Sequence, residues 1–230
     1  MRYLGGKFRI AKQISEVLKS YQEDGQVYVE PFVGAGWVLA EMEGVRQASD
    51  INPYLIAMYL ELQKGWIPPD GVSEGMYLWA KNDECPDYLK GFIGFGCSWG
   101  GKWFGGYARG GEGRDYSLNA KRSLLCLYPK LSGVCFRAVS YVDLSPSGCL
   151  IYCDPPYADT TEYDFCGKFD SIRFWDVMRC WSKSNTVIVS GYECPSDFMT
   201  IFEMPTRTDI RDKSGKMSVR TERLFKYKKG

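Results

Sequence analysis

The eight residues Leu150–Tyr157, Leu-Ile-Tyr-Cys-Asp-Pro-Pro-Tyr, place the strongest constraint on how this chain can fold. The first four are mostly apolar and are typical of a short buried strand. Because two consecutive prolines cannot continue a central ladder, the strand must end at Asp154. Asp154 and Tyr157 are therefore expected at the carboxyl end of a strand, which is where open α/β sheets bind their ligands.

The tetrad Asp154–Tyr157 suits the methylation of an exocyclic amine on an aromatic base. Such an amine is a poor nucleophile because its lone pair is delocalised into the ring. The Asp154 carboxylate and the Pro155 carbonyl can each accept one N–H and localise that lone pair. Tyr157 offers a ring face on which the base can stack, worth about 1–3 kcal/mol. The alternative is an ordinary tight turn that carries a surface Asp.

Length and composition narrow the classes of protein that fit. The chain has 230 residues and is 45% hydrophobic, which is enough for one core with an insertion. It has no histidine, which excludes Ser-His-Asp catalysis and HExxH metal sites. Nine cysteines without a CxxC pair argue against a zinc site, and no metal is predicted. The sequence shows neither a membrane-spanning run nor a signal peptide, so a cytoplasmic protein is expected.

Two glycine-containing stretches indicate a nucleotide-like ligand. Tyr3-Leu-Gly-Gly-Lys7 precedes a helical pattern, and glycines that lead into a helix can hold an anionic group beside Lys7. Val27–Trp37 is typical of a strand followed by a glycine turn, and residues 37–42 then predict a helix. The turn is neither GxGxxG nor a P-loop, which suits a nucleoside cofactor without a pyrophosphate, such as S-adenosylmethionine. The alternative is an ordinary strand-to-helix turn.

Asp50 follows Gly36 by fourteen positions. In dinucleotide-binding folds an acid about 20 residues beyond the glycine turn holds the ribose hydroxyls, and Asp50 suits that role. Alternatively, Asp50 caps the helix expected over Tyr54–Leu62, although Asn52 can supply that cap equally well.

Two basic segments suggest a polyanionic partner. Residues 81–137 contain nine Lys+Arg and five Asp+Glu, interleaved with glycines and aromatics. This mixture suits phosphate contacts and base stacking, and the alternative is a membrane-binding or low-complexity loop. Residues 205–230 contain nine Lys+Arg and three Asp+Glu and predict a hairpin with its turn at 212–216, or otherwise a solvated tail.

Four motifs occur in the order that one enzyme family shows: Tyr3-Leu-Gly-Gly-Lys7, Glu30-Pro-Phe-Val-Gly-Ala-Gly36, Asp50 with Asn52, and Asp154-Pro-Pro-Tyr157. By these motifs the chain resembles the Dam-type, class-alpha DNA adenine-N6 methyltransferases, which are common in bacteria and their phages. A phage or prophage enzyme is expected. Each motif is weak alone, but the four in this order are specific, and they span nearly the whole chain. The segment between Asp50 and Asp154 does not match the recognition region of GATC methylases, so the target sequence stays open.

The resemblance implies a Rossmann-like α/β fold of the S-adenosylmethionine-dependent methyltransferases. Its mostly parallel seven-stranded sheet would have flanking helices and a small inserted recognition region. Residues 1–64 and 138–230 would form the catalytic domain, and 65–137 the inserted DNA target-recognition region. The predicted catalytic residues are Asp154, Pro155, Pro156 and Tyr157. The predicted cofactor-binding residues are Tyr3, Gly5, Gly6, Lys7, Glu30, Pro31, Phe32, Gly34, Ala35, Gly36, Asp50, Ile51, Asn52 and Asp154. The predicted DNA-contacting residues are Trp99, Lys102, Trp103, Tyr107, Arg109 and Arg114.

The expected activity is the transfer of a methyl group from S-adenosylmethionine to N6 of an adenine in double-stranded DNA. The target base would be flipped out of the duplex into the tetrad pocket. Methylation of cytosine N4 is an alternative, because that amine can use the same tetrad. A catalytically inactive DNA-binding protein is the alternative from a different class. The enzyme is expected to act as a monomer, without a metal and away from membranes.

Overall fold

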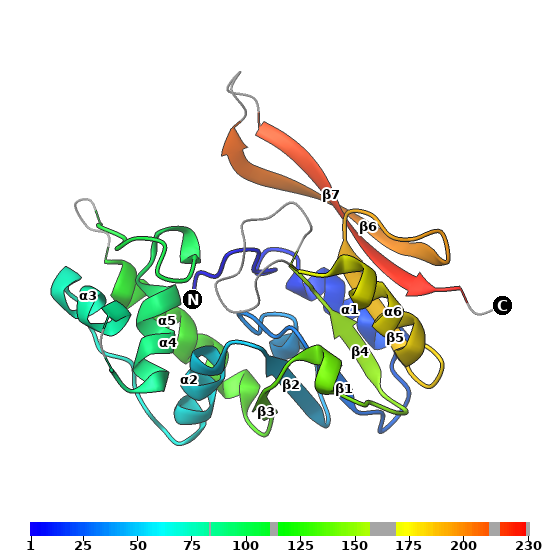
Figure 1. Cartoon of the computed structure of the whole chain (residues 1–230), viewed down its shortest axis with the longest axis horizontal. Coiled ribbons are helices and arrows are strands. Elements are labelled where there is room, and N and C mark those ends of the chain that lie inside the picture. Colours follow the sequence, from blue (N-terminus) through cyan, green and yellow to red (C-terminus); the bar gives the residue numbers. More distant parts are fainter. Residues whose placement is uncertain (83, 111–114, 157–168, 212–216, 229–230) are drawn as a thin grey trace.

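A computed structural model describes residues 1–82, 84–110, 115–156, 169–211 and 217–228, with the side chains of 206–211 and 217–220 left out. Its described residues form a seven-stranded sheet in the order β3-β2-β1-β4-β5-β7-β6 (Figure 1). The strands are β1 Tyr28–Glu30, β2 Arg46–Asp50, β3 Cys135–Ala138, β4 Leu150–Cys153, β5 Thr186–Gly191, β6 Phe198–Arg211 and β7 Met217–Tyr227. The first five in the order are parallel, and β7 runs antiparallel to both β5 and β6. The predicted α/β fold with a mostly parallel seven-stranded sheet is confirmed.

The central strands are apolar because both of their faces are covered. In β4 all four residues are buried, and the ladder stops before the two prolines, as the sequence predicts. Successive residues contribute to two different clusters of buried side chains. Leu150 and Tyr152 belong to one cluster, whereas Ile151 and Cys153 belong to the other. This alternation means that helices pack on both faces of the sheet.

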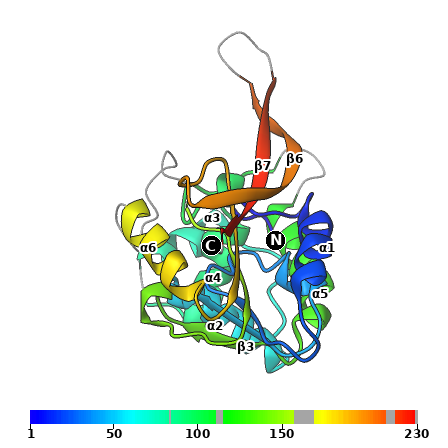
Figure 2. The ribbon, with the colours of Figure 1, turned by 90° about the vertical axis from the view of Figure 1, so that its right-hand side faces the viewer.

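Helices α1 Ala11–Tyr21 and α6 Ser171–Trp181 lie on opposite faces of the sheet (Figure 2). Each turns an apolar stripe inward, which includes Ile14 of α1 and Phe174 of α6. The predicted helix over residues 37–42 is wrong, because only the short 3-10 turn η1 Leu39–Glu41 forms there. Gly44, at φ +77°, then turns the chain directly into β2, which leaves no room for a longer helix.

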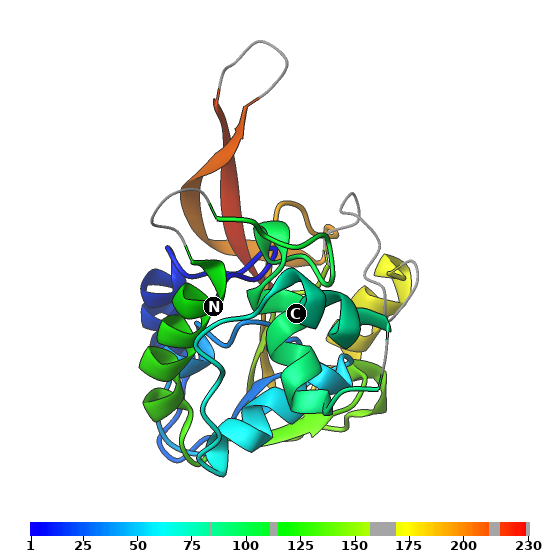
Figure 3. The same cartoon turned by 90° about the vertical axis from the view of Figure 1, so that its left-hand side faces the viewer.

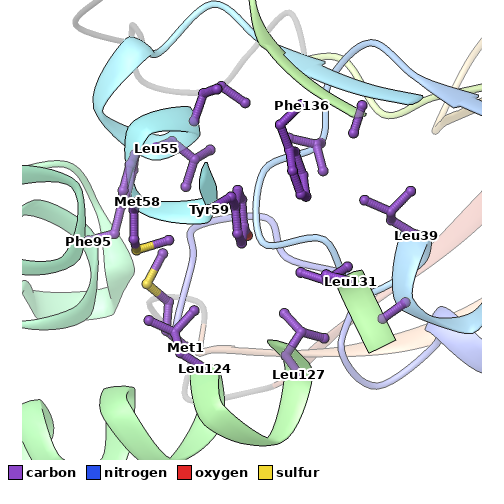
Figure 4. Close-up of a cluster of buried hydrophobic side chains, with 14 of the residues drawn as sticks. Met1, Leu39, Leu55, Met58, Tyr59, Phe95, Leu124, Leu127, Leu131 and Phe136 are labelled. Carbon is purple, nitrogen blue, oxygen red and sulfur yellow. The ribbon is translucent and has the colours of Figure 1, made fainter. Parts of the chain in front are cut away.

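A group of helices extends the face that carries α1. It consists of α2 Pro53–Gln63, α3 Glu74–Asn82, α4 Asp87–Gly96, η2 Trp99–Gly101, α5 Tyr116–Leu127 and η3 Tyr128–Leu131. These helices share one core with the sheet, in which Tyr59 stacks on Phe136 with ring centroids 4.9 Å apart (Figure 4). A Cβ atom on Gly91 would lie 2.2 Å from the carbonyl oxygen of Tyr54, so α4 can approach α2 this closely only with glycine there. The 3-10 turn η4 Tyr141–Asp143 lies between β3 and β4.

Strands β6 and β7 form a hairpin that projects from the body of the protein (Figures 1 and 3). Strand β5 pairs with β7 only from Ile188 to Gly191, so the earlier part of β7 continues beyond the sheet. Because Gly191 ends β5 and β7 is antiparallel to it, the hairpin extends past the carboxyl ends of the parallel strands. The predicted hairpin strands are confirmed, and the predicted turn at 212–216 lies outside the described residues. In the part of the chain that the structure describes, no helix combines the length and apolar character needed to cross a membrane.

Candidate active site

Three acidic residues follow neighbouring parallel strands at one edge of the sheet. Glu30 ends β1, Asp50 ends β2, and Asp154 comes directly after β4. Strand β1 lies between β2 and β4, so the predicted cofactor loop and the predicted catalytic tetrad begin side by side. The order of the strands along the chain reverses between β1 and β4, which is the position where open α/β sheets form a ligand crevice.

The loop after β1 is held in one conformation by contacts at Gly34. Its N–H donates a hydrogen bond to Asp50 Oδ2 at 3.1 Å, and its carbonyl accepts one from the Tyr59 hydroxyl at 2.8 Å. Gly34 has a φ of +46°, and a Cβ atom there would lie 3.0 Å from the ring of Tyr3. A residue without a side chain is therefore required at the point where the N-terminal segment meets the loop.

Asp50 is held by backbone donors, and Asn52 forms the helix cap. Oδ1 of Asp50 accepts the N–H of Asn52 at 3.0 Å, while the Asn52 side chain accepts the N–H groups of Tyr54 and Leu55 and so caps α2. Of the two predicted candidates for this cap, the structure uses Asn52. Burial raises the pKa of Asp50 to about 6, although the N–H donors of Asn52 and Gly34 oppose the shift. Asp50 thus presents an oriented carboxyl group at the end of β2.

Some of the other predicted cofactor residues are exposed at the site, whereas others are buried beneath it and hold it in place. Ile51 is 42% exposed and Phe32 is half-buried, with its ring 5.0 Å from that of Tyr141. Glu30 is buried and accepts a hydrogen bond from the Tyr28 hydroxyl, and burial raises the pKa of Glu30 to about 8. Glu30 therefore supports the loop from inside. The remaining members are the exposed glycines Gly5 and Gly6 and the buried Pro31, Ala35 and Gly36.

Lys7 joins the N-terminal segment to the catalytic strand. Its Nζ atom lies 3.0 Å from Asp154 Oδ1 and 3.3 Å from Glu222 Oε1 of β7. The side chains of Lys7 and Glu222 are buried, whereas that of Asp154 is 20% exposed and thus within reach of a substrate. Burial lowers the pKa of Lys7, but the Asp154 and Glu222 carboxylates outweigh it and raise that pKa above its ordinary value. Lys7 therefore stays charged between two carboxylates.

Sequence reasoning missed Glu222 and the residue that holds it. The Ser190 hydroxyl, next to the end of β5, donates a hydrogen bond of 2.6 Å to Glu222 Oε1. Strand parity was the available signal, because Glu222 shares a face with the fully buried Leu224. An acid at such an inward position needs a partner, but the sequence does not say which one.

The predicted DNA-contacting residues do not form one exposed surface. Trp99 is 66% exposed, and Arg109 is exposed beside Glu74. Trp103 stacks on Tyr54 and packs against Phe95 and Phe104, so its half-buried ring lies against the core. The Tyr107 hydroxyl donates to the carbonyl of Val72, and Lys102 is half-buried. Tyr157 and Arg114 lie outside the described residues.

A second glycine connects the helical group to the N-terminal segment. The N–H of Leu4 donates to the carbonyl of Gly101 at 3.1 Å. Gly101 has a φ of +69°, and a Cβ atom there would lie 2.6 Å from the backbone nitrogen of Tyr3. The exposed Trp99 is in the same short turn. The predicted cofactor segment is thus fixed by the same turn that carries a predicted DNA contact.

Comparison with protein families identifies the chemistry of this site. Residues 3–93 match the model of the D12 class N6 adenine-specific DNA methyltransferase family. The matched residues are 91 of the 230 in the chain, and the match supports an enzyme that methylates adenine in DNA. The match contains the glycine–lysine segment, the loop after β1 and Asp50, whereas Asp154 lies beyond the matched residues. The predicted transfer of a methyl group to N6 of adenine is confirmed, and the reaction requires a methyl donor and DNA.

Other comparisons show a remote structural likeness. The methyltransferase is similar to a solved structure from Pyrococcus horikoshii that is provisionally described as an RNA methyltransferase. The two chains have 8% sequence identity and a TM-score of 0.43, over 95% of this chain and 81% of that chain. Comparison with curated proteins gives no match.

Proposed function

We propose that this DNA adenine methyltransferase takes its methyl group from S-adenosylmethionine, held at the carboxyl ends of β1 and β2. The acceptor is an adenine of double-stranded DNA, flipped out of the duplex to the Asp154 end of β4. The observation that carries the proposal is the placement of Asp50, the Gly34 loop and Asp154 along one edge of the sheet.

The residues at this edge fit a nucleoside cofactor. Asp50 ends its strand with a carboxyl group fixed by two backbone donors, which suits an acceptor for ribose hydroxyls. Ile51 is partly exposed directly beside it and offers an apolar surface to a purine ring. Gly34 keeps the loop free of a side chain next to Tyr3, so that backbone can approach the ligand. When bound, S-adenosylmethionine supplies a methyl group on an electrophilic sulfonium.

Asp154 activates and orients the target amine. Its carboxylate accepts one N–H of the adenine amine, the Pro155 carbonyl accepts the other, and the nitrogen lone pair is thereby directed out of the ring. Lys7 holds one oxygen of Asp154 and so fixes the direction of the carboxylate. The amine proton becomes acidic once the new bond has formed, so Asp154 need not remove it beforehand. Positioning and electrostatics therefore supply much of the rate.

We assign DNA recognition to residues 65–137 and catalysis to residues 1–64 and 138–230. Within the described residues, Trp99 and Arg109 are exposed, whereas Lys102, Trp103 and Tyr107 are half-buried. Arg114 is kept as a further phosphate contact and Tyr157 as the ring on which the flipped adenine stacks. The enzyme is proposed to act on DNA as a monomer.

The test is a product assay on the purified protein. The enzyme is incubated with S-adenosylmethionine and unmethylated genomic DNA, the DNA is digested, and modified nucleosides are quantified by mass spectrometry. We expect N6-methyladenine from the wild type. Asp154→Ala should lose transfer by at least about a hundredfold, because the acceptor for the target amine is gone, while still binding DNA.

The matched control is Asp24→Ala, which removes an exposed carboxylate after α1 and should leave turnover unchanged. If Asp154→Ala turns over at the wild-type rate, the role given to Asp154 is wrong. If the wild type makes N4-methylcytosine, the proposed acceptor is wrong.

A further inference from the structure

Glu222 is a buried acid that the mechanism above does not use. It lies on β7 with 4% of its side chain exposed and shares the inner face of the sheet with Leu224. Removing a carboxylate from water without compensation is strongly unfavourable, and such groups persist when they are paired and hydrogen-bonded. Both conditions hold here, because Ser190 donates to Glu222 and the Lys7 ammonium faces it at 3.3 Å. Glu222 therefore has specific partners, and those partners lead to the catalytic residue.

The three charged groups form a bridge that runs from β7 to the end of β4. Glu222 stands diagonally across the ladder from Ser190, because Ser190 pairs with Leu224. Lys7 comes from the N-terminal segment and lies between Glu222 and Asp154, at 3.3 and 3.0 Å. A lysine ammonium has three N–H donors and can serve both carboxylates at once. The position of Lys7 is thus determined from both sides.

Sharing Lys7 changes the charge that the target amine meets. A lysine paired with Asp154 alone would neutralise it and weaken it as a hydrogen-bond acceptor. With Glu222 ionised, the three groups carry a net charge of −1, and the attraction of Lys7 is divided between two carboxylates. Asp154 then keeps a larger share of its negative charge while one of its oxygens stays fixed.

We infer that Glu222 is a positioning residue for methyl transfer: together with Ser190 it holds Lys7 so that the lysine orients Asp154 without neutralising it. This inference rests on the proposed role of Asp154 as the acceptor for the adenine amine. Glu222 touches neither substrate and acts through Lys7.

The main test is Glu222→Gln, which keeps the size of the side chain and its oxygen for Ser190 but removes the charge. We expect kcat to fall at least about tenfold, with KM for DNA changed much less, because the loss is in the activation of the bound amine. The acid limb of the kcat profile should move to lower pH, because the variant removes one negative charge near Asp154 while Lys7 and Glu30 still act on it. Glu222→Asp restores the charge and should recover part of kcat.

Two further variants distinguish an effect on the position of Lys7 from an effect on the stability of the fold. Ser190→Ala leaves the charge of Glu222 but removes its hydrogen bond, so we expect a smaller fall in kcat than in Glu222→Gln. Glu203→Gln removes a 56% exposed acid from the adjacent strand β6 and should keep the wild-type kcat and pH profile. Thermal unfolding of each variant reports the folded state.

The outcomes are distinct. A lower kcat together with a shifted acid limb in folded Glu222→Gln supports the inference. An unchanged kcat and pH profile overturns it, and so does a variant that differs from wild type only in its unfolding temperature. If the wild type itself forms no N6-methyladenine, the proposed function fails, and this inference fails with it.

Discussion

At the scale of single residues, the site is built from carboxyl groups buried at strand ends. Burial raises the pKa of Glu30 to about 8 and that of Asp50 to about 6, both above their ordinary values near 4. The chain has no histidine, so these acids are prominent among the groups that titrate near neutral pH. Their protonation couples the stability of the fold to pH.

The pH dependence of stability should show the effect of Glu30. In an unfolded chain Glu30 ionises near pH 4.5, whereas in the folded protein it holds its proton up to about pH 8. The folded state therefore binds more protons between these values, and the free energy of unfolding falls as pH rises through that window. We expect Glu30→Gln to reduce this fall by a few kcal/mol, at about 1.4 kcal/mol for each pKa unit.

Urea unfolding at pH 5.5 and pH 8.5 measures the difference. Glu16→Gln, at an exposed position of α1, is the matched control and should keep the wild-type difference. The account of Glu30 is wrong if Glu30→Gln loses as much stability between the two pH values as the wild type does.

At the scale of elements, glycines allow close approach between segments that are distant in the sequence. Gly91 lets α4 contact the backbone of α2, and Gly101 lets the η2 turn contact the N-terminal segment. Glycine generally lowers helix propensity, so the run Gly91-Phe-Ile-Gly-Phe-Gly96 resembles a loop in the sequence. In the structure it is a helix, because tertiary packing against α2 outweighs local preference.

Substitution of Gly101 tests the connection between η2 and the N-terminal segment. Gly101→Ala places a Cβ atom 2.6 Å from the backbone of Arg2 and Tyr3, so the segment must move. We expect a loss of about 1–3 kcal/mol in the free energy of unfolding and a weaker affinity for S-adenosylmethionine. Urea unfolding and titration calorimetry measure the two quantities.

Gly100→Ala is a close control for that substitution. Gly100 also has a positive φ, +63°, but a Cβ atom there meets nothing within 4 Å. It shares the backbone strain and lacks the collision, so it should cost less stability and leave the cofactor affinity unchanged. Equal effects of the two substitutions would show that the contact with the N-terminal segment is unimportant.

How much the sequence predicts depends on where the partner of each residue lies. The proximity of Asp50 and Asp154 was predictable because Asp50 ends one strand, Asp154 follows another, and parallel strands place their carboxyl ends together. Glu222 was not, because its partner Lys7 comes 215 positions earlier and no local pattern connects them. Trp103 was predicted as a DNA contact from composition, and its stacking on Tyr54, 49 positions earlier, could not be predicted from the local sequence.

At the scale of the whole molecule, the site joins segments that are far apart in the sequence. The N-terminal segment contacts η2, the loop after β1 and, through Lys7, both β4 and β7. A ligand that binds the folded state at this junction should therefore stabilise the entire protein and not one element.

Thermal unfolding with S-adenosylmethionine measures that coupling. At a concentration of about one hundred times Kd, a ligand adds roughly 2.7 kcal/mol to the stability of the folded state. For a chain of this length we expect a rise in Tm of about 5–10 °C, in a single transition. Adenosine and methionine added separately should raise it less.

Asp50→Asn tests whether the rise in Tm depends on the proposed cofactor site. It keeps an acceptor for the N–H groups of Gly34 and Asn52 but removes the charge proposed for the ribose hydroxyls. Its Tm shift at the same cofactor concentration should be smaller. A wild-type Tm that does not respond to S-adenosylmethionine would contradict the proposed cofactor site.

The contact between Lys7 and Glu222 joins a residue near the start of the chain to one near its end, so it can form only late in synthesis. A ribosome that adds about 5–20 residues per second needs roughly 10–40 s to reach Glu222 after Lys7 has been made. For about the first two thirds of that time neither carboxylate that faces Lys7 has been made, because Asp154 lies 147 positions after Lys7 and Glu222 lies 215 positions after it. The contact between Lys7 and Glu222 therefore forms only after β7 has left the ribosome and joined the sheet, so this part of the site is assembled after the cofactor loop has been made.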